Sequence, residues 1–258
     1  MKRLAFIGLL LFAVLFGAAI ARGELSGSDG LFVSFGGGFA PHSLPRDRDV
    51  PVTVTLDVGI KTADGSRPPQ LRRISLAVNR YGRLTTKGLP TCRPALLEST
   101  DPPTALARCG DALVGRGTFE ANVEFPNRAP FPVKGRMLAF NGVAHGKPAI
   151  LLHIHGSNPV DVTVILTFTI QHPKRGKFGT VLSTKIPRLA SDLGYVTGVE
   201  FVFNRRYTYR GKQYSFLSAR CAAPSGFPGA IFSFTRGTFT FAESKPIVTT
   251  LTRDCVVR

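Results

Sequence analysis

The sequence lacks the short motifs that mark most enzyme active sites. It contains no Gly-x-Ser-x-Gly nucleophile elbow, no His-Glu-x-x-His zinc motif and no phosphate-binding glycine loop ahead of a helix. Gly36-Gly37-Gly38 lies among strand-like segments, where we expect a flexible bend. These absences predict a protein without catalytic activity and without a cofactor.

Amphipathic helices of ordinary length are also missing. Only Pro94–Glu98 and Leu189–Leu193 resemble a turn or two of helix. Apolar residues instead alternate with polar ones, which is typical of strands with one buried face. The alternation runs through residues 31–35, 52–60, 74–78, 150–154, 162–170 and 199–203. The sequence therefore predicts an all-β fold, a β-sandwich built either as one large sandwich or as two similar sandwich domains.

Charged residues are absent from a long stretch near the N-terminus. Lys2 and Arg3 precede seventeen uncharged residues, 4–20, and Ala19-Ile20-Ala21 resembles a signal peptidase site. We expect residues 1–21 to be a signal peptide; an uncleaved anchor is the alternative, although a spanning helix needs about 20 apolar residues. Asn-x-Ser/Thr acceptors are absent, which favours a bacterial source. The prediction is a secreted or envelope-associated protein with no transmembrane segment after cleavage.

The four cysteines suit an oxidising compartment. Cys92, Cys109, Cys221 and Cys255 allow three pairings, of which we favour the chain-local one, Cys92 with Cys109 and Cys221 with Cys255. None of them forms the close Cys-x-x-Cys pair of a zinc site, so we expect no metal bound through sulfur.

Basic residues far outnumber acidic ones. The formal charge of the whole chain is +17, and loss of Lys2 and Arg3 would lower it by two. A protein this basic is attracted to polyanions, here an anionic envelope polymer, although no specific nucleic-acid motif is present. Equally, the charge could be spread evenly and serve solubility alone.

Two basic turns are the best candidates for contact with a polyanion. Cations beside planar aromatic rings can bind phosphate or stack on sugars and bases. The alternative is that the tyrosines brace a hairpin whose tip carries solvated charge. The candidate residues are Lys174, Arg175, Lys177, Arg205, Arg206, Tyr207, Tyr209, Arg210 and Lys212.

His153 and His155 are the sharpest metal-like feature. On a strand their side chains share one side, while Ile150, Leu152 and Ile154 face the core. The spacing matches the His-x-His of cupins, but Pro159 stands where a Glu ligand would be needed. We expect an exposed histidine pair and no metal. A metal-dependent or carbohydrate-active β-barrel enzyme centred on this pair is the alternative function.

Two short segments recur at about half the chain length. Ala107-Arg108-Cys109 and Arg116-Gly117-Thr118-Phe119 are echoed by Ala219-Arg220-Cys221 and Arg236-Gly237-Thr238-Phe239. The echo suggests two similar domains or halves, residues 22–145 and 146–258.

The middle of the chain resembles a group of uncharacterised exported bacterial β-rich proteins. The residues concerned are Leu89-Pro90-Thr91-Cys92, Cys109, Val114-Gly115-Arg116-Gly117 and the run 135–142. The resemblance implies export, a β fold and a local bridge between Cys92 and Cys109. It implies no activity, and a purely structural envelope protein fits the sequence as well.

Overall fold

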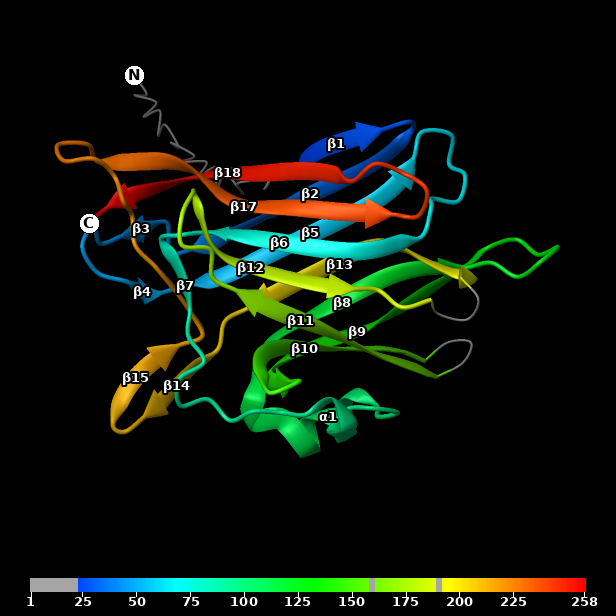
Figure 1. Ribbon diagram of the computed structural model, residues 1–258, viewed down its shortest axis with the longest axis horizontal. Helices are drawn as coiled ribbons and strands as arrows, with labels where there is room; N and C mark the ends of the chain where they lie inside the picture. The colour runs from blue at the N-terminus through cyan, green and yellow to red at the C-terminus, as the bar shows by residue number, and fades with distance from the viewer. Residues whose placement is uncertain (1–22, 158–160, 189–191) are drawn as a thin grey trace, which may run out of the picture.

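A computed structural model describes residues 23–157, 161–188 and 192–258. The predicted signal peptide, residues 1–21, lies outside this part of the chain, as do residues 189–191 of the predicted helical turn. The described elements, shown in Figure 1, are nearly all strands. They are β1 (Glu24–Ser28), β2 (Leu31–Ala40), β3 (Ser43–Leu44), β4 (Val50–Pro51), β5 (Thr53–Thr62), β6 (Leu71–Asn79), β7 (Gly82–Leu84), β8 (Leu113–Val123), β9 (Phe131–Ala144), β10 (Lys147–Gly156), β11 (Val162–Gln171), β12 (Phe178–Lys185), β13 (Gly194–Phe203), β14 (Arg206–Tyr209), β15 (Lys212–Ser215), β16 (Leu217–Ala219), β17 (Gly229–Phe241) and β18 (Ile247–Val257), with helix α1 (Pro102–Cys109) and the 3-10 turns η1 (Pro94–Leu96) and η2 (Gly110–Ala112).

Thirteen strands form one large sheet, in the order β1-β2-β5-β13-β8-β9-β10-β11-β12-β6-β17-β18-β3. The pairs are antiparallel except for β18 with β3, which makes the sheet mixed. The sheet curls until its two ends meet. Thr252 N on β18 donates to Glu24 Oε1 on β1 at 2.9 Å, and Arg253 Nε donates to Gly37 O on β2 at 2.7 Å. The predicted all-β fold is confirmed.

Strands from the two predicted halves alternate in this sheet. β13 lies between β5 and β8, and β6 lies between β12 and β17. The two ranges therefore share one hydrogen-bonded sheet.

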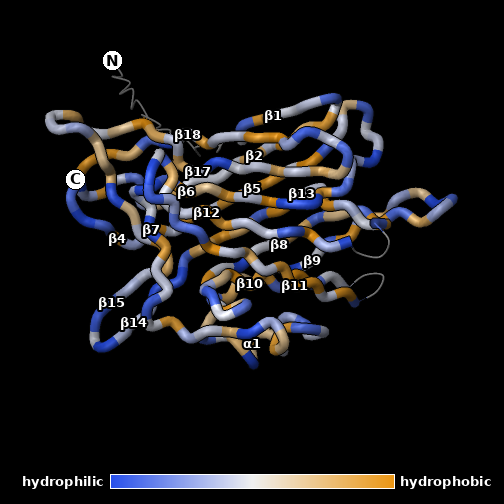
Figure 2. Tube along the Cα trace, in the orientation of Figure 1, coloured by the Kyte–Doolittle hydropathy of each residue, from blue (hydrophilic) through white to orange (hydrophobic). Residues whose placement is uncertain are grey.

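The concave side of the sheet holds the core. One buried cluster gathers side chains of β2, β5, β17 and β18, and a second gathers those of β8–β13. Ile74, Leu76 and Leu217 pack against both, so the two clusters form one continuous apolar interior. The alternating positions that predicted the strands point into it. Figure 2 shows the alternation as successive orange and blue segments along the strands.

The glycine run 36–38 is part of β2 and not the flexible bend that we expected. All three residues are paired with β5, and Gly36 and Gly37 are buried. The Asp57 side chain lies where a Cβ of Gly36 would stand, and Gly37 has φ of 131°. The glycines therefore make room for a neighbouring strand and for one unusual backbone conformation.

Helix α1 is the main element that the sequence analysis missed. Asp101 caps it by accepting a hydrogen bond from Thr104 N at 2.9 Å, and Pro102 occupies its first position. Asp-Pro-Pro reads equally well as a turn, but a capping residue followed by proline is also how a helix begins. With η1, the helix covers the outer face of β9 and β10 through a third buried cluster that includes Leu97, Ala105 and Leu151.

The structure forms the two disulfides that the sequence favoured. Cys92–Cys109 ties the segment after β7 to α1, with 5.6 Å between the Cα atoms. Cys221–Cys255 ties the chain after β16 to β18, with 5.7 Å between the Cα atoms. Disulfides are typical of proteins outside the reducing cytosol. Within the described ranges, no helix has both the length and the apolar character needed to cross a membrane.

We predict that Cys221–Cys255 contributes about 4 kcal/mol to the free energy of unfolding, because it closes a loop in the unfolded chain. Its sulfurs join residues 34 positions apart. The double variant Cys221→Ala/Cys255→Ala should show this loss in urea unfolding without reductant. With reductant present, the two proteins should differ far less. Equal stability of the two proteins under oxidising conditions would contradict the prediction.

Candidate functional site

The β14–β15 hairpin carries the larger of the two predicted basic turns. Arg210 and Gly211 have φ of 49° and 71°, as a two-residue type I′ turn requires. Arg206, Arg210 and Lys212 are exposed, and the guanidinium of Arg210 lies 5.2 Å from the centre of the Tyr209 ring. The hairpin therefore presents three cations to solvent, Arg206 at its base and Arg210 and Lys212 at its tip.

Two of the predicted contact residues are part of the framework. Tyr207 is only 8% exposed; its hydroxyl donates to Lys87 O at 2.7 Å and its ring stacks on Tyr214. The expectation that Tyr207 stacks on a ligand is therefore wrong. Arg205 is half-buried and donates to Asp111 O at 3.2 Å. Tyr209 is half-buried, packed on Gly88, and supports Arg210.

The second basic turn connects β11 to β12. Lys174, Arg175 and Lys177 are all exposed. The turn is held by Arg80, whose backbone N donates to Lys177 O at 2.9 Å and whose Nε donates to Gly176 O. Arg80 was not among the predicted residues, because only the pairing of β12 with β6 brings it here.

Both turns lie at the same end of the curled sheet, which we call the basic end. Because β12 pairs antiparallel with β6, and β13 with β5, the β11–β12 turn, the β6–β7 turn and the β14–β15 hairpin share one end. In Figure 1 this is the end where the C-terminus lies, with β7 between the two turns. The exposed or partly exposed cations of the basic end are Arg80, Arg83, Lys174, Arg175, Lys177, Arg206, Arg210, Lys212 and Arg220.

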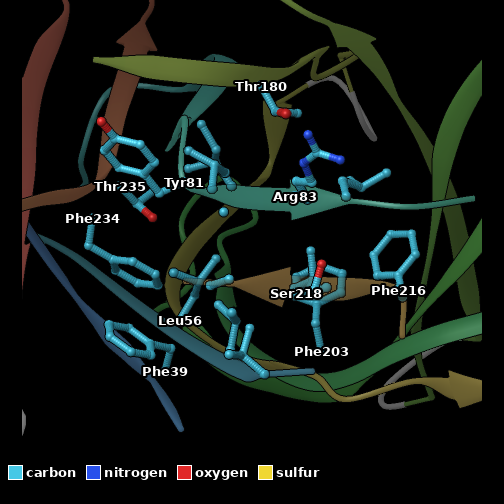
Figure 3. A pocket seen from close by; sticks show the side chains of 18 of the residues that line it. Phe39, Leu56, Tyr81, Arg83, Thr180, Phe203, Phe216, Ser218, Phe234 and Thr235 are labelled. Atoms are coloured by element: carbon cyan, nitrogen blue, oxygen red, sulfur yellow. The ribbon is translucent and has the colours of Figure 1, made fainter. Parts of the chain in front are cut away.

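An apolar cavity of about 80 Å³ lies inside the sheet beside the basic end. Phenyl rings and aliphatic side chains make most of its wall, and five polar residues also line it: Arg83, Thr180, Ser218, Arg220 and Thr235. Figure 3 shows Arg83 and Thr180 on one side of the cavity and Phe39 and Phe203 on the other. Its lining includes Phe39, Leu56, Leu76, Val78, Tyr81, Arg83, Thr180, Phe203, Phe216, Leu217, Ala219, Arg220 and Phe234.

Arg83 and Arg220 share one carboxylate at the edge of this cavity. Arg83 Nε lies 3.0 Å from Asp49 Oδ2, and Arg220 Nη1 lies 3.3 Å from Asp49 Oδ1. The Arg220 guanidinium also lies 5.4 Å from the centre of the Tyr81 ring. Two positive charges against one negative charge leave this group with a net charge of about +1, since Arg stays protonated.

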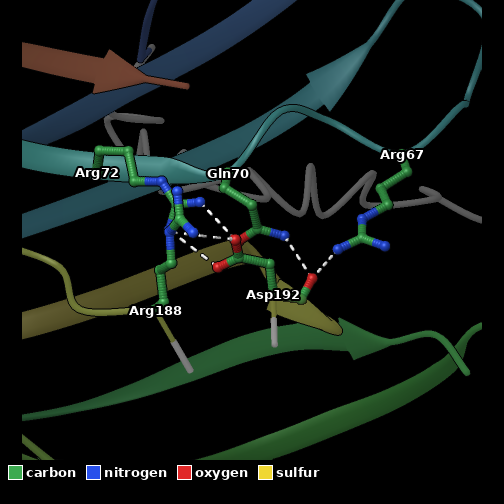
Figure 4. A network of polar contacts seen from close by, with 5 residues as sticks. All are labelled: Arg67, Gln70, Arg72, Arg188 and Asp192. Atoms are coloured by element: carbon green, nitrogen blue, oxygen red, sulfur yellow. Dashed lines mark hydrogen bonds and ion pairs between the residues drawn. The ribbon is translucent and has the colours of Figure 1, made fainter. Parts of the chain in front are cut away.

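The opposite end of the sheet carries a network of arginines and carboxylates. Asp192 is its centre: Arg72 donates to both carboxylate oxygens, at 2.9 and 2.5 Å, and Gln70 and Arg67 donate to the Asp192 carbonyl (Figure 4). Arg188 approaches the same carboxylate at 4.0 Å. The hydrogen bonds from Arg72 lower the pKa of Asp192. This network fastens the segment before β13 to β6.

His153 and His155 point away from the apolar interior, as the alternation predicted, but they are not exposed. His153 is fully buried, because the segment before α1 covers this face of β10. Its Nε2 lies 2.8 Å from Thr100 O, so Nε2 carries the proton and donates. Thr163 Oγ1 also donates to Thr100 O, at 2.7 Å, and His155 Nδ1 in turn donates to Thr163 Oγ1 at 3.1 Å.

The histidine pair therefore anchors the segment before α1 to β10 and β11. The nitrogens that make these bonds use their protons, which leaves no lone pair there for a metal. Among the described residues, no group of three or more His, Cys, Asp or Glu side chains could hold a metal ion.

No protein-family model, no curated protein and no solved structure matches this chain.

We predict that the His153 ring titrates below its ordinary pKa of 6.5, because burial disfavours the charged imidazolium. A depressed pKa in the folded protein means that the unfolded chain takes up the proton first. Stability should therefore fall as the pH drops below about 6.5, until the folded pKa is passed. NMR titration of the ring, and unfolding of His153→Gln beside the parent protein at neutral and mildly acidic pH, test this. A midpoint at or above 6.5 would contradict it.

Proposed function

We propose that this protein is exported and, without catalysing a reaction, binds an anionic polymer of the cell envelope through its basic end. The observation that supports the proposal is the placement of charge: exposed cations gather in two neighbouring turns of one end, while at the other end Arg72 and Arg188 lie against the Asp192 carboxylate. The disulfides support a location outside the cytosol.

The spacing of the cations favours a polymer over a small anion. The β11–β12 turn and the β14–β15 hairpin are separate projections with β7 between them (Figure 1). A chain of phosphates, sulfates or carboxylates can touch both turns, whereas a single small anion can touch one. Attraction of this kind is long-ranged and tolerates many polyanions.

Among the tyrosines of the β14–β15 hairpin, Tyr209 is best placed to contact a sugar or base, because its half-buried ring lies beside Arg210. Tyr207 and Tyr214 stack on each other and stiffen the hairpin. We therefore attribute binding to the cations, with a minor contribution from stacking.

The proposal predicts steep salt dependence. Four phosphate contacts would weaken binding to a single-stranded oligonucleotide about 50-fold between 50 and 200 mM salt. Fluorescence anisotropy with labelled oligonucleotide and labelled heparin measures this directly. The double variants Arg206→Glu/Lys212→Glu and Lys174→Glu/Lys177→Glu should each lose at least tenfold in affinity at low salt.

A matched control is available at the opposite end. Arg128 and Lys245 are exposed, so Arg128→Glu/Lys245→Glu changes the net charge by the same amount. This control should lose much less affinity. Equal losses of affinity in all three variants would mean that only net charge matters. If the protein bound no polyanion even at low salt, the proposal would be overturned in favour of a purely structural envelope protein.

A further inference from the structure

We infer that the cavity beside the basic end is a second binding site, which takes a small aliphatic carboxylate. The hydrocarbon chain would enter the cavity, and the carboxylate would lie between Arg83 and Arg220. This site goes beyond the proposed polymer binding, because it uses the interior of the sheet and not its projecting turns.

The wall of the cavity selects an apolar group. Side chains from β2, β5, β6, β12, β13 and β17 converge on it, and Phe39, Phe203 and Phe234 contribute phenyl rings (Figure 3). The phenyl and aliphatic part of the wall offers a water molecule few of the two to four polar partners that it needs. A hydrocarbon chain fills such a space favourably, with about 0.8 kcal/mol per buried CH₂, or about fourfold in affinity.

The edge of the cavity selects an anion. Arg83 and Arg220 both line the cavity, yet 67% and 32% of their side chains are exposed, and Tyr81 beside them is 40% exposed. The cavity wall therefore reaches solvent at these residues. Asp49 engages one nitrogen of each arginine, which leaves further guanidinium N–H groups to donate to a carboxylate.

The size of the cavity limits the length of the hydrocarbon chain that it can hold. One water needs about 10–15 Å³ of such space, so a cavity of about 80 Å³ holds a chain of several carbons. We therefore expect affinity to rise along the series acetate, propionate, butyrate and pentanoate, and then to level off for longer chains.

The experiment is an NMR titration of the ¹⁵N-labelled protein with sodium salts of this series, followed at the amides of β7 and β16. Binding should tighten about fourfold for each added CH₂ up to pentanoate. 1-Pentanol, which has the chain without the charge, should bind at least tenfold more weakly. The absence of a saturable shift at about 10 mM pentanoate would overturn the inference, because even a site with a millimolar Kd would be filled at that concentration.

Two variants separate the contribution of the ligand's hydrocarbon chain to binding from that of its carboxylate charge. Ala219 lines the cavity, so Ala219→Leu should fill it and abolish pentanoate binding, while Ala242→Leu at the opposite end should not. Arg83→Gln/Arg220→Gln should reduce pentanoate binding to the level of 1-pentanol and leave 1-pentanol unchanged. Arg128→Gln is the matched control. Should Ala219→Leu fail to fold, the arginine variant alone decides, because partly exposed Arg→Gln changes are tolerated.

The two sites can be told apart. Arg206→Glu/Lys212→Glu should weaken polymer binding and leave pentanoate binding unchanged. Pentanoate binding that survives both Ala219→Leu and Arg83→Gln/Arg220→Gln would contradict the inference, whatever becomes of the polymer.

Discussion

Burial of the apolar face of one curled sheet is the constraint on which the rest of this structure depends. The sheet brings its first and last strands together, and bonds between β18 and the β1–β2 pair hold the curl. The long strands of the sheet then run between the two ends of the molecule, so the turns that join them fall at one end or the other (Figure 1). Residues far apart in sequence, such as Arg80, Lys177 and Arg210, meet at an end only because the strands that carry them are neighbours or share a direction.

The two ends differ in what their side chains do. At one end, Asp192 collects hydrogen bonds from arginines and a glutamine, and the cations serve the fold. At the other, the cations of the two turns project into solvent, and one carboxylate, Asp49, is shared by two arginines. Surface ion pairs contribute little to stability, whereas unpaired like charges at one end create a field that attracts anions. The function that we propose follows from this difference.

The sequence analysis found the features that depend on local pattern. Period-two alternation located β2, β5, β6, β10, β11 and β13, and chain-local pairing located both disulfides. Features that depend on tertiary contact were missed. His153 is buried because the segment that leads into α1 lies over β10. Tyr207 is buried, and its hydroxyl donates to the Lys87 carbonyl. Only strand pairing brings Arg80, Arg83 and Arg220 to the basic end.

Hydrogen–deuterium exchange of the native protein tests the central claim most directly, because one continuous sheet should open as one unit. β13 is bonded to β5 on one side and β8 on the other, and β6 to β12 and β17. The slowest amides of β5, β6, β8, β13 and β17 should therefore exchange with the same free energy, and destabilising β13 should speed exchange in β5 and β8 alike. Protection that splits into two independent sets, one for residues 23–145 and one for 146–258, would contradict the account.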